Sequence, residues 1–158
     1  MMDNKDKLLK YVIYYLSKYS SSKKNLEYIL KKKIRRISDD KRIRFILYNE
    51  ISIIISKLEN KNLINDHLYT DLKIRSLLNQ AKSSNYIKQY LYKKGINKKL
   101  ADEQVALFYE NNKNLEKENA LKFAKKKKLL GNEKDYEKKL AKFARAGFSY
   151  EIAKEILK

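Results

Sequence analysis

The sequence predicts an all-α protein made of three tandem three-helix repeats, helix-turn-helix-like in character, that form an elongated, curved array. Proline is absent from the 158-residue chain and glycine occurs only three times, whereas sheets and long loops normally use more of both. Apolar residues recur at helical spacing along the chain. The pattern of residues 63–105 also returns 52 positions later. Such self-similarity is typical of repeat proteins, in which each repeat needs its neighbours to bury an apolar face.

The first third of the chain predicts three helices separated by polar breaks. Residues 7–19 carry one apolar face, and the serines at 20–22 end that helix and can cap the next, over residues 23–37. Ser38-Asp39-Asp40 is a stop and start signal that places acids at the following N-terminus. Residues 41–60 then form a long helix, and the residues expected to point inward are Ile43, Ile46, Leu47, Ile51, Ile54, Ile55 and Leu58.

The middle third predicts a helix that starts at an N-cap formed by Asn65-Asp66 and ends at about Gln80. Ser83-Ser84-Asn85 restarts the chain, and apolar positions from Tyr86 to Leu91 line the next helix. Lys94-Gly95-Ile96-Asn97 ends that helix, because glycine supplies a left-handed residue, isoleucine packs back and asparagine caps the following helix.

The repeats are recognised by this turn. Gly147-Phe148-Ser149 has the same order of glycine, apolar residue and capping residue, 52 positions after Gly95. The first third fits at an offset of 61, which pairs Ser22 with Ser83, but Ile34 stands where the glycine is expected. We therefore predict repeats over residues 1–62, 63–114 and 115–158, the first being a variant with a long third helix.

The charge predicts a polyanionic partner. Lys and Arg number 38 against 19 Asp and Glu, a net charge of +19, and the first 62 residues hold 16 basic and 7 acidic residues. This balance is typical of proteins that bind nucleic acid, a nucleoprotein or an acidic protein surface. Only six of the basic residues are arginine, so a Lys-rich composition that follows from codon bias is the alternative.

The candidate contact residues flank the break at 38–40 and are Lys31, Lys32, Lys33, Arg35, Arg36, Lys41, Arg42 and Arg44. Lysines act as point charges that suit phosphates, and nothing here indicates base reading; the alternative is a solvated helix face. A second run, Lys125–Lys128, is more typical of a solvated face. Four consecutive helical residues point all round the helix, so we expect at least one of them along the core edge.

Three further features each have two interpretations. Arg75 either contacts a partner or bridges to Asp71 four residues earlier. Lys93 and Lys94 either contact a partner or interact with the dipole of the helix that ends there. Thirteen tyrosines allow base stacking, yet most have core spacing, as do Tyr11, Tyr69, Tyr86 and Tyr90; Tyr92 and Tyr109 fit neither pattern.

The sequence contains few residues of the types that commonly form catalytic sites. Cysteine is absent, His67 is the one histidine, and no glycine-rich phosphate loop or carboxylate pair stands out. We expect no enzyme activity, no metal and no cofactor. The N-terminal segment lacks the features of a secretion signal and the longest apolar run is too short to span a bilayer, so we expect a cytoplasmic protein without membrane contact.

Four short motifs follow one another in a fixed order, namely Leu63-Ile64 with Asp66 and Tyr69, Ile74-Arg75-Ser76, Lys94-Gly95-Ile96, and Ala144-Arg145-Ala146-Gly147-Phe148-Ser149. In their order and spacing the chain resembles the RecX family of bacterial recombinase regulators, over nearly its whole length. Members of that family are arrays of three-helix repeats, and Arg75 sits at the family's arginine position.

The resemblance implies a non-enzymatic regulator. Family members bind the filament of RecA on single-stranded DNA, lie along its groove and restrain strand exchange, ATP turnover and co-protease activity, so they regulate DNA repair, recombination and the SOS response. The expected partners are then the RecA filament and DNA phosphates, and we expect a monomer. Two alternatives follow from charge alone: a general basic helical nucleic-acid-binding protein without RecA specificity, and a protein-binding helical adaptor.

Overall fold

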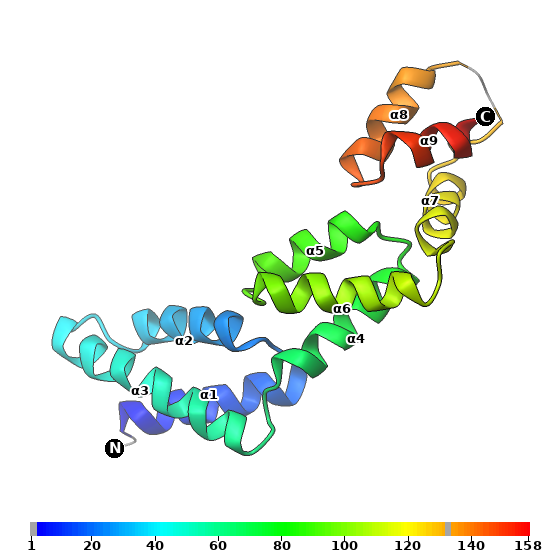
Figure 1. Cartoon of the computed structure of the whole chain (residues 1–158). Coiled ribbons are helices and arrows are strands. Elements are labelled where there is room, and N and C mark those ends of the chain that lie inside the picture. The colour runs from blue at the N-terminus through cyan, green and yellow to red at the C-terminus, as the bar shows by residue number, and fades with distance from the viewer. Residues whose placement is uncertain (1–2, 132–133) are drawn as a thin grey trace. The chain divides into compact units, whose positions relative to one another are not determined.

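A computed structural model describes residues 3–131 and 134–158. Met1 and Met2, the first residues of the N-terminal segment that was expected to lack a secretion signal, lie outside these ranges. The described residues form nine α-helices and no strand, which confirms the all-α prediction (Figure 1). Contacts divide the chain into two compact units. The first runs to Tyr69 and includes Lys94–Ile96, and the second contains residues 70–93 and 97–158.

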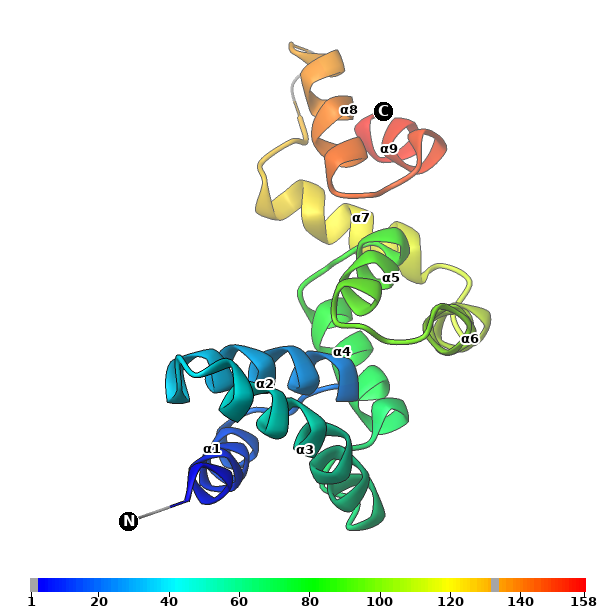
Figure 2. The same ribbon diagram turned by 90° about the vertical axis from the view of Figure 1, so that its left-hand side faces the viewer.

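The first compact unit is built on α1 (Asn4–Lys18), α2 (Lys23–Ile37) and α3 (Lys41–Asn60), which lie side by side in Figures 1 and 2. The predicted bounds of α2 and α3 are confirmed, whereas α1 begins three residues before the expected position 7. Their inward faces form one core of fully buried aliphatic side chains, among them Leu8, Leu26 and Leu30. The prediction that Ile46 points inward is wrong, because 51% of this residue is exposed.

The helix starts follow the predicted capping chemistry. The Ser22 hydroxyl accepts the Asn25 backbone N–H at the start of α2. The Asp40 carboxylate accepts the Arg42 backbone N–H, at 2.7 Å, at the start of α3. Each cap satisfies a backbone donor that the first helical turn leaves without a partner, so these short polar breaks fix the helix bounds locally.

The second compact unit takes up α4 (Asp66–Asn79), which begins in the first, and continues through five more helices. These are α5 (Ser84–Lys93), α6 (Lys98–Glu110), α7 (Leu115–Lys126), α8 (Tyr136–Arg145) and α9 (Tyr150–Leu157). The last three helices enclose a core in which Phe123, Phe143 and Phe148 pack together, with ring centroids 5.3–5.8 Å apart.

Two glycine turns adopt the predicted left-handed conformation. Gly95 has φ +74° and Gly147 has φ +86°, values that residues with a Cβ rarely adopt. Ile96 and Phe148 follow them and are buried, and the side chains of Asn97 and Ser149 cap α6 and α9. The two copies of this turn are therefore alike in conformation as well as in sequence.

Each glycine turn belongs to a larger contact, which we call the joint, and the chain forms it twice. In the first compact unit the Ser22 hydroxyl, which caps α2, also donates to the carbonyl oxygen of Lys94. In the second, the Ser83 hydroxyl accepts the Tyr86 backbone N–H at the start of α5 and donates to the carbonyl oxygen of Ala146 at 2.6 Å. A serine at one helix start is thus bonded to the residue before a glycine far along the chain.

An acidic side chain completes each joint. Asp66 accepts the backbone N–H of Lys23, at 2.9 Å, and Glu116 accepts the backbone N–H of Ser84 at 3.0 Å. Asn65-Asp66 was expected to open α4 as an N-cap, and the Asn65 side chain does so by accepting the Leu68 backbone N–H. Asp66 also serves the start of α2. A local cap and a long-range acceptor look identical in sequence, because both place an acid at a helix start.

The glycines of the joints are also required by space. A Cβ on Gly95 would lie 2.5 Å from the Lys24 Cβ, and one on Gly147 would lie 2.6 Å from the Ser83 Oγ. Both distances are shorter than real Cβ contacts, so any larger residue would push the two segments apart. The two boundaries between the three repeats, at residues 62 and 114, stay a prediction.

Candidate nucleic-acid interface

The predicted basic run occupies the C-terminal half of α2, the break at 38–40 and the first turn of α3. Most of its members are exposed to solvent, and only Lys33 and Arg44 are half-buried. Exposure leaves these side chains able to contact an anion. The surroundings of five of the eight side chains place those five in three groups, whereas Arg35, Lys41 and Arg42 are simply exposed.

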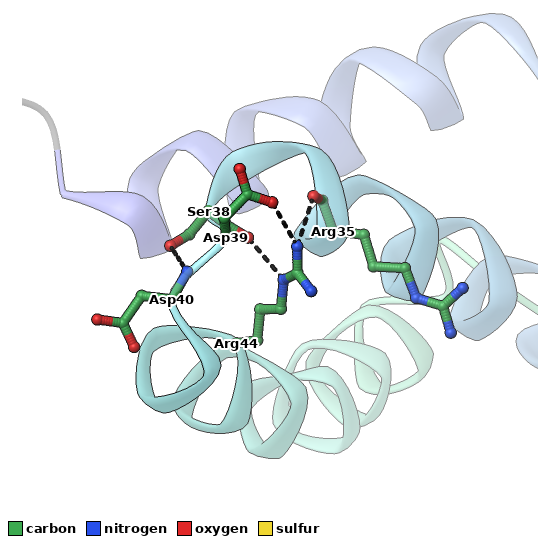
Figure 3. A network of polar contacts seen from close by, with 5 residues as sticks. All are labelled: Arg35, Ser38, Asp39, Asp40 and Arg44. Atoms are coloured by element: carbon green, nitrogen blue, oxygen red, sulfur yellow. Dashed lines mark hydrogen bonds and ion pairs between the residues drawn. The ribbon is translucent and has the colours of Figure 1, made fainter.

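Arg44 is held within the protein (Figure 3). Its Nε donates to the carbonyl oxygen of Ser38 at 2.6 Å, and its Nη2 donates to the Asp39 carboxylate at 2.7 Å and to the carbonyl oxygen of Arg35 at 3.3 Å. These carbonyls end α2, where the last backbone acceptors lack helical partners. Arg44 therefore fastens the start of α3 to the end of α2 and has few donors left for a partner.

Lys31 and Lys32 have partners on their own helix. Lys31 forms an ion pair with Glu27, one turn earlier, and the Lys32 Nζ lies 4.9 Å from the centroid of the Tyr28 ring. Both contacts are exposed and each is worth only a few tenths of a kcal/mol up to about 1 kcal/mol, so a phosphate could compete with them.

Lys33 and Arg36 face a groove between α1 and α2, which we call the α1–α2 groove. It has a volume of about 510 Å³, and its other cations are Lys7 and Lys10. No carboxylate belongs to its lining. Lys7 and Lys10 were not predicted as contact residues, although their spacing puts them on the helix face that also carries Tyr11 and Tyr14. Four cations from two helices thus converge where the sequence showed a single run.

The same groove carries two tyrosines beside its cations. Tyr11 was expected in the core, and it does pack there in part, but its ring also lies 4.7 Å from the Lys33 Nζ. Tyr14 is 58% exposed, and the Lys18 Nζ lies 4.6 Å from its centroid. An exposed ring among cations offers both a stacking surface and phosphate-binding charges, which is how sequence-independent sites hold single strands.

Arg75 forms the structural bridge that was one of its two interpretations. Its Nε donates to the Asp71 carboxylate at 2.9 Å, and its guanidinium lies 5.0 Å from the centroid of the Phe108 ring. The hydrogen bond to Asp71, and then the charge of that carboxylate, raise the pKa of Arg75. Its side chain remains 63% exposed, so the bridge orients the guanidinium without covering it.

The remaining predicted residues have local roles. Lys93 is exposed in the last turn of α5, and Lys94 contributes its backbone carbonyl to the first joint. Tyr92, which fitted no pattern, donates its hydroxyl to Asp102, and this hydrogen bond raises the pKa of Tyr92 to about 12. Tyr109 is largely buried, and burial raises its pKa as well.

Two features are absent from the described residues, namely a metal-binding cluster and a membrane-spanning helix. No group of three or more His, Cys, Asp or Glu side chains within residues 3–131 and 134–158 could hold a metal ion. Over the same ranges, no helix has the length and the apolar character needed to cross a membrane.

Comparison with known proteins finds two relatives that share one name. No family model matches the chain. A protein of Myxococcus xanthus (strain DK1622) named "Regulatory protein RecX" is 29% identical over 159 aligned positions, which span 92% of this chain and 81% of that protein. A protein of the same name from Clostridioides difficile (strain 630) is 36% identical over 114 positions, which span 69% of this chain but only 52% of that protein.

Solved structures agree over a longer span. The crystal structure of RecX from Lactobacillus salivarius has a TM-score of 0.67 and 27% identity, and the match covers 99% of this chain and 96% of that one. A second crystal structure of a RecX regulatory protein has a TM-score of 0.68 over 98% of this chain and 71% of that one; at 23% identity it supports the fold alone.

Proposed function

We propose that this chain, as a member of the RecX family of regulatory proteins, binds the filament which RecA forms on single-stranded DNA. Bound there, it restrains the recombinase, ATPase and co-protease activities of RecA, and so regulates DNA repair and recombination. It does this as a monomeric cytoplasmic protein without catalytic residues or a cofactor.

One observation carries the nucleic-acid part of this proposal, namely the α1–α2 groove. Lys7, Lys10, Lys33 and Arg36 line it without a carboxylate. The helices that form it belong to the first 62 residues, where 16 basic residues oppose 7 acidic ones. A filament of protein on DNA presents phosphates that such a groove can bind. Arg35, Lys41 and Arg42 extend the same charge along α2 and into α3.

The test measures DNA-dependent ATP hydrolysis by RecA while the protein is added in substoichiometric amounts. We expect hydrolysis to fall and filaments to shorten. The variant Lys33→Gln/Arg36→Gln should need several-fold more protein for the same effect. The matched control is Lys57→Gln/Lys61→Gln, which removes the same charge from exposed positions at the end of α3. Unchanged hydrolysis with the wild-type protein would end the proposal.

Salt dependence separates this proposal from its alternatives. Four phosphate contacts to a single strand give a log–log slope of about −3, since each contributes about −0.7, so binding should weaken roughly 50-fold between 50 and 200 mM salt. Equal affinity for naked DNA and for the RecA filament would instead favour a general nucleic-acid-binding protein. Affinity for the filament that does not respond to salt would favour a helical adaptor.

A further inference from the structure

A second basic cavity lies in the second compact unit, away from every residue used above for phosphate binding. It has a volume of about 500 Å³ and lies between the turn after α4, the end of α7 and the end of α8. Five cations line it, from three separate segments, and they are Lys82, Lys126, Lys127, Lys142 and Arg145. No carboxylate is among the lining residues.

The run Lys125–Lys128 contributes two of these cations, and its predicted arrangement is wrong. Helix α7 ends at Lys126, so the four lysines do not encircle a helix, and all four are exposed. The backbone at Lys128 turns to φ +53°. Ending the helix here directs Lys126 and Lys127 to the same cavity as the last turn of α8.

The charges around this cavity have no internal counter-charge. Among the residues that the structure describes, Lys126, Lys127, Lys142 and Arg145 form no ion pair. Like charges gathered around one cavity repel each other, and an anion that enters it relieves this repulsion. The cavity is therefore suited to a multiply charged anion.

The rest of the lining is aromatic. Tyr86 was expected in the core, but it is 38% exposed, and the Lys82 Nζ lies 4.5 Å from its ring centroid. Phe123 and Phe148 also line the cavity and are held by contact with each other, at 5.5 Å between centroids. A small hydrated anion gains nothing from three rings, whereas a ligand with a planar aromatic part does.

We propose that this cavity binds a nucleotide, with its phosphates on the cations and its base against the aromatic side chains. The volume lies within the range of about 300–1,000 Å³ that is usual for small-molecule sites. An acidic peptide fits less well, because only Gln80 and the Tyr86 hydroxyl are neutral polar groups among the lining side chains, and a peptide backbone needs several such partners. The nucleotide is either free or part of a single strand, and the site does not depend on the function proposed above.

The test uses isothermal titration of the full-length protein, without RecA, with four probes: ATP, inorganic tripolyphosphate, adenosine and a ten-residue oligothymidylate. We expect ATP or the oligonucleotide to bind at least tenfold more tightly than tripolyphosphate, because the phosphates alone leave the aromatic rings unused. Adenosine should bind weakly, because it lacks the anion. Tighter binding of ATP identifies a free nucleotide as the ligand. Tighter binding of the oligonucleotide identifies a single strand if it persists in the Lys33→Gln/Arg36→Gln variant, which weakens the α1–α2 groove.

Matched variants locate the binding. Lys126→Gln/Lys142→Gln should weaken nucleotide binding at least tenfold, whereas Lys113→Gln/Lys122→Gln, which removes the same charge from exposed positions of the same compact unit, should change it less than twofold. In the unchanged protein, ATP or the oligonucleotide should shift the amide resonances of Lys127 and Ala146. Tripolyphosphate that binds as tightly as both nucleotides, or equal losses in the two variants, would overturn the proposal.

Discussion

Ser83→Ala removes one oxygen atom that serves two segments of the chain. The Ser83 side chain is fully buried, and its hydroxyl accepts from the Tyr86 N–H at 3.1 Å while it donates to the Ala146 carbonyl at 2.6 Å. Alanine keeps the backbone and the Cβ, so the change tests these two hydrogen bonds and little else. The Ser149 hydroxyl provides the comparison, because it caps α9 at an exposed position and has no second hydrogen-bond partner among the described residues.

The expected loss is the sum of two parts. A lost serine N-cap costs about 1 kcal/mol, within a range of roughly 0.5–2. The half-buried Ala146 carbonyl, left without its donor, costs about 1–3 kcal/mol more. Ser83→Ala should therefore lower the free energy of unfolding by about 2–4 kcal/mol, and Ser149→Ala by about 1 kcal/mol. The difference between the two variants measures the hydrogen bond that closes the joint.

Urea unfolding followed by circular dichroism at 222 nm measures both variants. Both serines belong to the second compact unit, so their effects should appear in the same transition. With an m-value of about 2 kcal/mol/M, the midpoint should fall by about 1–2 M for Ser83→Ala and by about 0.5 M for Ser149→Ala. Equal shifts would show that the bond to Ala146 adds nothing, and the joint would then be a packing contact only.

Three other changes have defined outcomes. Arg44→Ala should lower the free energy of unfolding by about 1–3 kcal/mol, because two carbonyls at the end of α2 lose their donor. Arg42→Ala, at an exposed position, should change it by less than about 0.5 kcal/mol. Thermal unfolding compares the two variants. Lys128→Gly should raise the free energy of unfolding, measured by urea titration, by about 0.5–1 kcal/mol, because glycine adopts φ +53° without steric cost. A decrease would contradict this reasoning. The difference in absorbance at 295 nm between wild type and Tyr92→Phe should titrate near pH 12, and Asp102→Asn should bring that ionisation towards pH 10. Since the folded-state pKa of Tyr92 is raised, its stabilising contribution should be present below about pH 10 and disappear as the pH rises to about 12; a titration near pH 10 in the wild type would refute the role of Asp102.

Features that depend on neighbouring residues could be predicted from the sequence. The bounds of α2 and α3 follow from Ser22 and Asp40, which cap the helices that begin beside them. The glycine turns at Gly95 and Gly147 follow for the same reason, since a left-handed residue, a buried apolar residue and a cap are read within three positions. Local chemistry of this kind also carries the resemblance that the comparisons confirm.

Features that depend on distant segments could not be predicted. Ile46 satisfies the helical spacing of α3, but the long helix has more apolar positions than its neighbours cover. Arg44 has the composition of a phosphate contact and is instead engaged by carbonyls of the preceding helix. Lys7 and Lys10 are ordinary surface lysines until α2 brings Lys33 beside them. In each case packing between helices decides the role of the residue, and the sequence of a single helix does not reveal that packing.

The two sides of the joint are different, and this limits where a further joint could form. Its receiving side needs a serine hydroxyl at a helix start, and its inserting side needs a glycine turn. At the start of α8, 52 positions after Ser83, stands Asp135, whose carboxylate would repel an incoming carbonyl and makes no capping bond. In α2, 61 positions before Gly95, stands Ile34, a fully buried residue inside the helix, so this position has no glycine turn to insert. The serine and the glycine turn that a third joint would need are therefore both missing at these positions.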